Sequence, residues 1–149
     1  MRRDIAAKWI VVILLLVILL SAFRVVFEFA TRQTVHIGGQ AIKVRLANTP
    51  ESRERGLSGT DKLASKEGLL LVFDHSAKWD IWMKDMHYNI DVVWLDADKK
   101  VVDVLPNLSP DTYPHKFQPQ EDARYVLELP AGFAAQYGVM YGTLAVFDG

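Results

Sequence analysis

The chain has 149 residues, of which 50% are hydrophobic and 23% are charged, and it contains no cysteine. These proportions are typical of a globular protein, and the lack of cysteine excludes disulfide bonds and a nucleophilic thiol. Of the 17 Lys and Arg and 18 Asp and Glu residues, five and two lie in the first 32 positions, which leaves a net charge of −4 on the remainder. This negative charge argues against nucleic acid as a partner.

The first segment of the chain predicts a membrane anchor. Trp9 to Phe23 contains no charged residue, and with Ala6 and Ala7 it approaches the roughly 20 apolar residues that a helix needs to span a bilayer. A helix packed on a soluble core would have a polar face, and this segment has none. A cleaved signal peptide is the alternative, although Leu20 is larger than the residues that such cleavage sites contain.

Charges around this segment predict its orientation. Three basic residues precede it and Arg24 follows it, and basic residues are enriched on the cytoplasmic side of membrane helices. We therefore expect a single-pass protein of the cell membrane, with the lipid bilayer as a partner. Residues 1–33 would form a cytoplasmic tip, the anchor and an interfacial extension, and residues 34–149 an extracytoplasmic domain.

The rest of the chain predicts a β-rich domain. Segments with alternating or continuous apolar residues are typical of strands. They lie at residues 34–48, 68–73, 80–91, 91–106, 123–130 and 143–148. Gly38 and Gly39, and also Asp96 to Lys99, have the composition of hairpin turns. The expected fold is mainly β (β-rich α+β), a compact antiparallel barrel or rolled sheet.

Two short helices and one long loop complete the prediction. Thr49 and Pro50 are typical of the N-cap and the first position of a helix, and Gly56 is placed to end it. Residues 131–139 predict a second helix. Residues 106–120 hold four of the six prolines, which indicates a loop.

The stretch DIWMKDMHYNID, Asp80 to Asp91, is a candidate ligand site. As a strand it would place Trp82, Lys84 and Met86 on one half-exposed face. An aromatic wall and an ammonium group near Asp91 would suit a small anionic or sugar-like ligand. The alternative is a structural face, in which a partly buried Lys84 must pair with a carboxylate. The candidates for that carboxylate are Asp85, Asp91 and Glu128.

Asp91 and Glu128 are a second candidate constellation. Both lie among apolar strand residues, and a pair of carboxyl groups performs acid and base catalysis in glycoside hydrolases. The alternative is that each acid faces solvent from its strand. The sequence has no nucleophile or phosphate-loop motif, and its four histidines lack metal-site spacing. We therefore expect no catalytic residue, metal or cofactor.

Four stretches resemble one protein family: RERGLSG, GLLLVFD, IWMKDMHYNIDVVWLD and ARYVLELPAG. They are similar to the domain of unknown function 192 family, also called uncharacterised protein family 0127, over about Val35 to Val146. The matching positions are Arg53, Gly56, Leu57, Gly68, Phe73, Trp82, Met83, Lys84, Asp91, Tyr125, Glu128, Ala131 and Gly132. The chain departs from the family pattern at Ser58, Asp85, Asn89 and Thr143.

The resemblance implies an exported or membrane-tethered β-rich domain and no particular activity, because the family's function is unknown. Its motifs contain two cations and two acids, Arg53, Lys84, Asp91 and Glu128. These groups would either satisfy one another in a structural network or form a ligand site.

We predict a non-enzymatic module of the cell envelope that binds a ligand or an envelope protein. Its candidate ligand-binding residues are Arg53, Trp82, Lys84, Asp91 and Glu128. One alternative is a hydrolase or carbohydrate-active enzyme that uses Asp91 and Glu128, and another is an assembly factor for a membrane partner.

Overall fold

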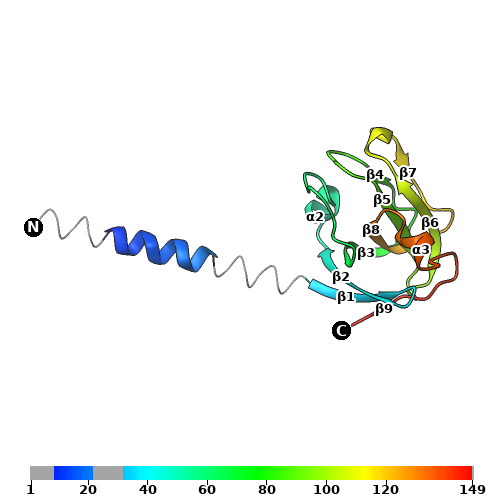
Figure 1. The fold of residues 1–149 in the computed structure, drawn as a ribbon, viewed down its shortest axis with the longest axis horizontal. Coiled ribbons are helices and arrows are strands. Elements are labelled where there is room, and N and C mark those ends of the chain that lie inside the picture. The colour runs from blue at the N-terminus through cyan, green and yellow to red at the C-terminus, as the bar shows by residue number, and fades with distance from the viewer. Residues whose placement is uncertain (1–8, 22–31, 149) are drawn as a thin grey trace, which may run out of the picture. The chain divides into compact units, whose positions relative to one another are not determined.

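The computed structural model describes residues 9–21 and 32–148 (Figure 1). The chain divides into two compact units, Met1–Arg32 and Gln33–Gly149. In the first unit, residues 9–21 are helical. Among the described residues, no helix has the length and hydropathy needed to cross a bilayer. The other parts of the predicted anchor, residues 1–8 and 22–31, lie outside the described residues.

The second unit is built on a curled, half-barrel β-sheet (Figure 1). Seven strands are hydrogen-bonded in the order β6-β5-β8-β3-β2-β1-β9. They are β1 Arg32–Ile37, β2 Gln40–Ala47, β3 Glu67–Ala77, β5 Ile90–Leu95, β6 Val101–Leu108, β8 Ala123–Pro130 and β9 Val146–Phe147. A separate two-stranded sheet joins β4 Ile81–Trp82 to β7 Lys116–Phe117. The mainly β, rolled architecture is confirmed, but β2 and β3 run parallel, so the sheet is not wholly antiparallel.

The C-terminal segment bridges the two edges of this sheet. The Val101 N–H, at the start of β6, donates to the Thr143 carbonyl, and the Gly142 N–H donates back to the Val101 carbonyl, both at 2.8 Å. A few residues later β9 pairs with β1, with Phe147 opposite Val35. The gap between the edge strands is therefore crossed by a short segment rather than closed by direct strand pairing as in a complete barrel.

Short helices follow the sequence signals closely. Thr49 Oγ1 accepts from the Ser52 N–H at 3.2 Å, and Ser52 Oγ accepts from the Thr49 N–H at 2.9 Å, which confirms the predicted N-cap. Gly56 ends the helix with φ 54° and ψ −127°, a conformation that essentially only glycine adopts. Residues 106–120, predicted as a loop, also contain the end of β6, a 3-10 helix and β7, so that prediction is wrong in part. The helices described in the second unit are α2 Pro50–Arg55, the 3-10 helix Pro110–Thr112 and α3 Phe133–Gln136.

The stretch from Asp80 to Asp91 is not one continuous strand. β4 ends at Trp82, and a turn follows in which Asp85 has φ 53°. Met86, which follows this turn, is only 9% exposed and belongs to the core. The predicted half-exposed face therefore holds for Trp82 and Lys84, which lie together, and is wrong for Met86, because strand alternation stops after Trp82.

Two hydrophobic clusters lie on opposite faces of the sheet. What we call the first face carries a cluster that includes Leu69, Leu71, Phe73, Val92, Trp94 and Val126. The second face carries a cluster that includes Leu70, Val93, Leu95, Leu127, Leu129 and Phe133. Successive residues of a strand point to opposite faces, and directly paired residues share one. Most strands of this sheet are therefore apolar on both sides.

Candidate functional site

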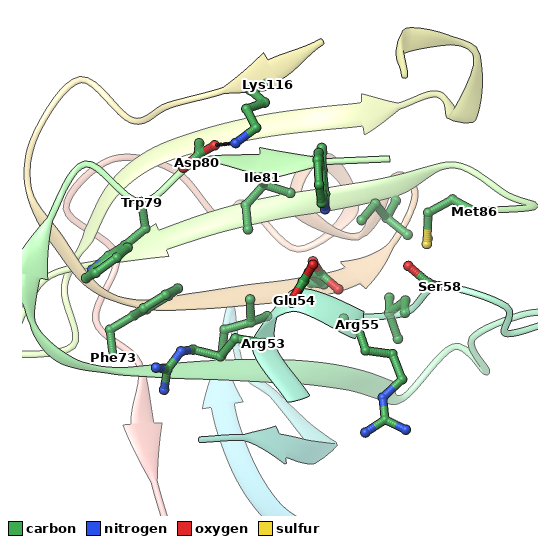
Figure 2. A pocket seen from close by; sticks show the side chains of 16 residues that line it. Arg53, Glu54, Arg55, Ser58, Phe73, Trp79, Asp80, Ile81, Met86 and Lys116 are labelled. Atoms are coloured by element: carbon green, nitrogen blue, oxygen red, sulfur yellow. Dashed lines mark ion pairs between the residues drawn. The ribbon is translucent and has the colours of Figure 1, made fainter. Parts of the chain in front are cut away.

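A cavity of about 210 Å³ opens on the first face of the sheet (Figure 2). Its walls come from the end of α2 and the turn after it, from β3, from β4 and its flanking residues, and from β8. The lining residues are residues 53–58, Leu71, Phe73, residues 79–82, Met86, Ile90, Lys116 and Glu128. Of the five predicted site residues, the structure brings together Arg53, Trp82 and Glu128 around this cavity and leaves Lys84 and Asp91 outside its lining.

Glu128 is the buried carboxyl group of the cavity, with 5% of its surface exposed. Its direct partners in the neighbouring strands are Leu69 and Val92, which belong to the first face, so the register points its side chain into that layer. Among the described residues, no group donates a hydrogen bond to its Oε2 atom. The ion pairs among the described residues join Lys116 to Asp80 and His36 to Asp148, and neither involves Glu128.

Burial changes the acidity of Glu128. The loss of hydration raises the pKa of Glu128 from 4.5 to about 7, and the more distant charge of Arg45 opposes this rise. Arg45 pairs with Leu69, which in turn pairs with Glu128, so the two residues are two strands apart on the same face. Near neutral pH the protonated and ionised forms of this carboxyl group are therefore both populated.

Gly56 keeps the space beside this carboxyl group open. A Cβ atom added at Gly56 would lie 3.9 Å from both carboxyl oxygens of Glu128, within van der Waals contact. The turn after α2 thus passes over the carboxyl group with no side chain in between. The glycine that the backbone conformation requires also leaves room for a group that approaches Glu128.

A stack of three side chains forms another wall. The rings of Phe73 and Trp79 lie 4.2 Å apart with an interplanar angle of 9°, and the Arg53 guanidinium lies 5.1 Å from the centroid of Phe73. Figure 2 shows Phe73 between Trp79 and Arg53. Arg53 Nη1 also donates to the carbonyl groups of Asn48 at 3.0 Å and Val72 at 2.9 Å. These bonds fix the guanidinium as part of the wall.

Trp82 lies among cations at the rim. The ammonium groups of Lys116 and Lys84 lie 5.0 and 5.5 Å from its ring centroid, within the range of cation–π attraction. Lys116 also pairs with Asp80 at 2.6 Å, an ion pair visible in Figure 2. This rim joins β4 to β7 through their side chains as well as their backbones.

Lys84 lies on the turn after β4, at a neighbouring depression that Glu51, Glu54, Arg55, Ser58 and Asp85 also line. Its backbone carbonyl accepts a hydrogen bond from Ser58 Oγ at 2.7 Å. No ion pair joins it to a carboxylate within the described part of the chain. Lys84 is partly buried, as that prediction required, but the predicted pairing with Asp85, Asp91 or Glu128 is wrong, because its ammonium lies over the ring of Trp82 instead.

Asp91 is fully buried, with 0% of its surface exposed. Its carboxylate accepts from the N–H groups of Asn107 at 2.8 Å, Gly132 at 3.0 Å and Ala134 at 2.8 Å. In the sheet it pairs with Leu129, a residue of the second face. Asp91 therefore ties the start of α3 to the end of β6 and plays a structural part.

The two acids of the predicted catalytic pair point to opposite faces of the sheet. Glu128 pairs with Val92 of the first face, and Asp91 pairs with Leu129 of the second. A β-sheet therefore separates the two carboxyl groups, and they cannot flank one glycosidic bond. The predicted network of Arg53, Lys84, Asp91 and Glu128 is wrong for the same reason.

Sequence reasoning missed Phe73, Trp79, Asp80, Lys116 and Gly56 as cavity residues. Phe73 and Gly56 could have been found as candidate site residues, because both lie in the motifs shared with the family. Trp79 comes after a register shift between Val72 and Ala77 in the β3–β8 pairing, and no local pattern shows that it folds back onto Phe73.

A family model matches residues 33–146 of this chain. The chain belongs to the DUF192 family. The model describes this family as "Uncharacterized ACR", so membership of DUF192 gives no activity. The resemblance inferred from the motifs is confirmed for the family, although none of the comparisons tests export or membrane tethering.

Curated relatives carry the name UPF0127 protein. The one from Thermococcus gammatolerans is 33% identical over 105 residues, which is 70% of this chain and 66% of that protein. The one from Thermococcus kodakarensis is 32% identical over 102 residues, 68% of this chain and 62% of that protein. The chain thus spans less than two thirds of the length of these DUF192 relatives.

Solved structures share the fold of this DUF192 chain. A protein of Sinorhizobium meliloti, described as "a putative transcription regulator", superimposes with a TM-score of 0.73 at 26% identity, over 78% of this chain and 93% of its own. A protein of unknown function from Novosphingobium aromaticivorans gives a TM-score of 0.71 at 22% identity, over 77% of this chain and 83% of its own. The second likeness concerns the fold alone.

Proposed function

We propose that the second unit is a non-enzymatic ligand-binding module and that residues 1–33 anchor it outside the cytoplasm at the cell membrane. The observation that carries the binding role is the buried carboxyl group of Glu128 in an aromatic-lined cavity, whose Oε2 atom has no hydrogen-bond partner among the described residues. A protein that only needed a stable core would gain by replacing such a group with an apolar one. A carboxyl group retained there is explained by a ligand that supplies the missing hydrogen bond.

The chemistry of the cavity favours binding over catalysis. Asp80 pairs with Lys116 at the rim, Glu54 is exposed, and Asp91 lies on the other face of the sheet. Among the described residues, Glu128 therefore has no second buried carboxyl group on its face of the sheet, which a catalytic pair in the core would need. Apolar walls with a few polar groups are typical of sites that bind small molecules.

The anchor is supported by the first unit taken alone. The large apolar side chains from Trp9 to Leu20 are between 43% and 65% exposed on the helix of residues 9–21. Contiguous exposed apolar surface of this kind needs a covering environment. A bilayer is the environment that an uncharged, uniformly apolar helix suits, and the basic residues before it favour a cytoplasmic N-terminus.

A fragment screen tests the binding role. Small molecules would be added to the purified full-length chain, and the indole N–H signals of Trp79 and Trp82 would report binding at the cavity by NMR. Trp82→Ala should weaken binding of any hit, because it removes part of the lining. Tyr113→Ala is the matched control, since Tyr113 contacts the Trp82 ring edge-on at 6.0 Å without lining the cavity. A screen with no hit that depends on Trp82 would refute the binding role.

A further inference from the structure

We propose that the cavity binds a small organic cation, an alkylammonium group, with the Glu128 carboxylate as its counter-ion and the aromatic lining as its second contact. This inference rests on the proposed function and adds the chemical class of the ligand. It follows from three properties of the cavity: an uncompensated acid, aromatic rings in the lining, and buried walls that are otherwise apolar.

The first property is that no cation of the lining compensates Glu128. Arg53 donates to two backbone carbonyls and stacks on Phe73, and Lys116 pairs with Asp80. In Figure 2 the guanidinium of Arg55 points away from Phe73 and Trp79. A buried carboxylate is stable only when a charge or several donors meet it, so a ligand with a positive charge supplies what the protein leaves out.

The second property is the affinity of the aromatic lining for cations. Three cations of the chain lie within 5.5 Å of a lining ring: Arg53 at Phe73, and Lys84 and Lys116 at Trp82. The electron-rich face of an aromatic ring attracts a cation by up to about 2 kcal/mol when both are desolvated. Trp79 and Arg53 already cover the two faces of Phe73, so Trp79 and Trp82 are the lining rings that we assign to the methyl or methylene groups around a charged nitrogen.

The third property excludes two other ligand classes. Apart from Glu128, the buried residues of the wall are apolar, and besides the aromatic rings they are Leu57, Leu71, Ile81, Met86 and Ile90. A sugar-like ligand would bury several hydroxyl groups against these side chains without hydrogen-bond partners, which is costly. An anionic ligand would meet the carboxylate of Glu128, Lys84 does not line the cavity, and the lining cations Arg53 and Lys116 already bind backbone carbonyls and Asp80. A cation with a small apolar surface has neither disadvantage.

The volume limits the size of the cation. At about 210 Å³, the cavity is below the roughly 300–1,000 Å³ of sites for drug-sized molecules. It therefore suits a single ammonium head with short substituents. Such a head occurs free in solution and also at the end of a larger molecule such as a lipid, and both sources share the chemistry that Glu128 recognises.

The test uses tetramethylammonium and its neutral analogue tert-butanol. Each is titrated into the purified full-length chain in a non-ionic detergent at pH 8 and constant ionic strength, and the indole signals of Trp79 and Trp82 are followed by NMR. We expect tetramethylammonium to bind more tightly than tert-butanol. Glu128→Gln keeps the shape of the side chain and removes its charge, so it should weaken tetramethylammonium binding by about ten- to a hundredfold and leave tert-butanol binding unchanged.

The outcomes separate this inference from the proposed function. If tert-butanol binds as tightly as tetramethylammonium and Glu128→Gln affects neither, the cavity binds ligands but the cation is wrong. If tetramethylammonium causes no shift, the cation is wrong, and the fragment screen judges the binding role by itself. A third titration, with phosphocholine, identifies the source of the cation: tighter binding than tetramethylammonium indicates a lipid head group, and equal binding indicates a free cation.

Discussion

Glu128 shows how one residue can act against the stability of its own fold. Its side chain is buried in the first face, none of the described residues gives its Oε2 atom a hydrogen bond, and the loss of water raises its pKa to about 7. Ionisation of Glu128 is unfavourable in the folded protein, where the carboxyl group is buried, but not in the unfolded chain, where it is hydrated. The cost of Glu128 therefore depends on pH.

The first prediction concerns this pH dependence. Between pH 4.5 and about 7 the folded protein holds the Glu128 proton that the unfolded chain has released, so the free energy of unfolding should fall as pH rises. The fall is about 1.4 kcal/mol per pH unit, on the order of 3 kcal/mol across the window. Urea unfolding of wild type and Glu128→Gln at pH 4, 5.5, 7 and 8 measures it, because the difference between the two cancels every other titrating group.

We expect Glu128→Gln to gain stability over wild type by that amount between pH 4 and pH 8. A difference that stays flat across this range would mean that Glu128 is hydrated or paired in solution. The cavity would then lack the uncompensated acid on which the binding role depends.

Asp91 is the opposite case, and the second prediction concerns it. Its carboxylate accepts three backbone N–H groups, all of which lose their partner in Asp91→Ala. We expect a loss of about 3 kcal/mol or more in the free energy of unfolding, since each bond to a charged acceptor contributes about 1.5–3 kcal/mol. Asp122→Ala, on an exposed aspartate, is the control and should change the midpoint of urea unfolding little. A loss no larger than that of the control would rule out the structural role.

At the scale of the elements, α2 is what brings Arg53 and Gly56 to the cavity. It has only six residues, Pro50–Arg55, and none of them is buried. A helix this short does not hold itself together by propensity or by burial. Its capping box, made by Thr49 and Ser52, therefore carries an unusual share of its stability.

The third prediction follows from this dependence. Thr49→Ala removes the cap and should lower the stability of α2 by about 1 kcal/mol. The main effect should be more frequent local unfolding of this helix. Hydrogen exchange should speed up at the amides of Arg53 and Gly56, which bond to Thr49 and Ser52 carbonyls, by about fivefold for that energy. The control is Ser109→Ala, which removes the cap of the 3-10 helix instead and should leave these two amides unchanged. Equal exchange in both variants would mean that tertiary contacts hold α2.

The strands also explain which parts of the site were predictable from sequence. Hairpin turns, the α2 cap and the buried strand near Leu71 depend on neighbouring residues, and they were predicted. The relation of Asp91 to Glu128 depends on the register of β5 against β8, and a shift of one residue would put both acids on one face. Both strands are apolar on their two sides, so no hydrophobic pattern reveals that register. The prediction of a catalytic pair is wrong because it depended on this register.

At the scale of the whole molecule, the two units differ in what they need from their surroundings. The second unit buries its apolar residues in two clusters of its own. Large side chains of the helix at residues 9–21 are exposed all along its length. The proposed membrane location therefore depends on the first unit alone, and it can be tested without disturbing the cavity.

The fourth prediction is that the full-length chain stays with membranes through an alkaline carbonate wash and that residues 34–149 alone do not. Leu15→Lys combined with Leu16→Lys should release much of the chain, because a lysine at the centre of a membrane helix costs about 3 kcal/mol by insertion scales. Leu144→Lys makes the same change at an exposed leucine of the second unit and should stay in the pellet. Protease added outside sealed, right-side-out vesicles should digest the second unit. If the double variant pellets like wild type, the proposed anchor is wrong, and if the second unit is protected from protease, the proposed orientation is wrong. Neither result would bear on the binding of tetramethylammonium in the cavity.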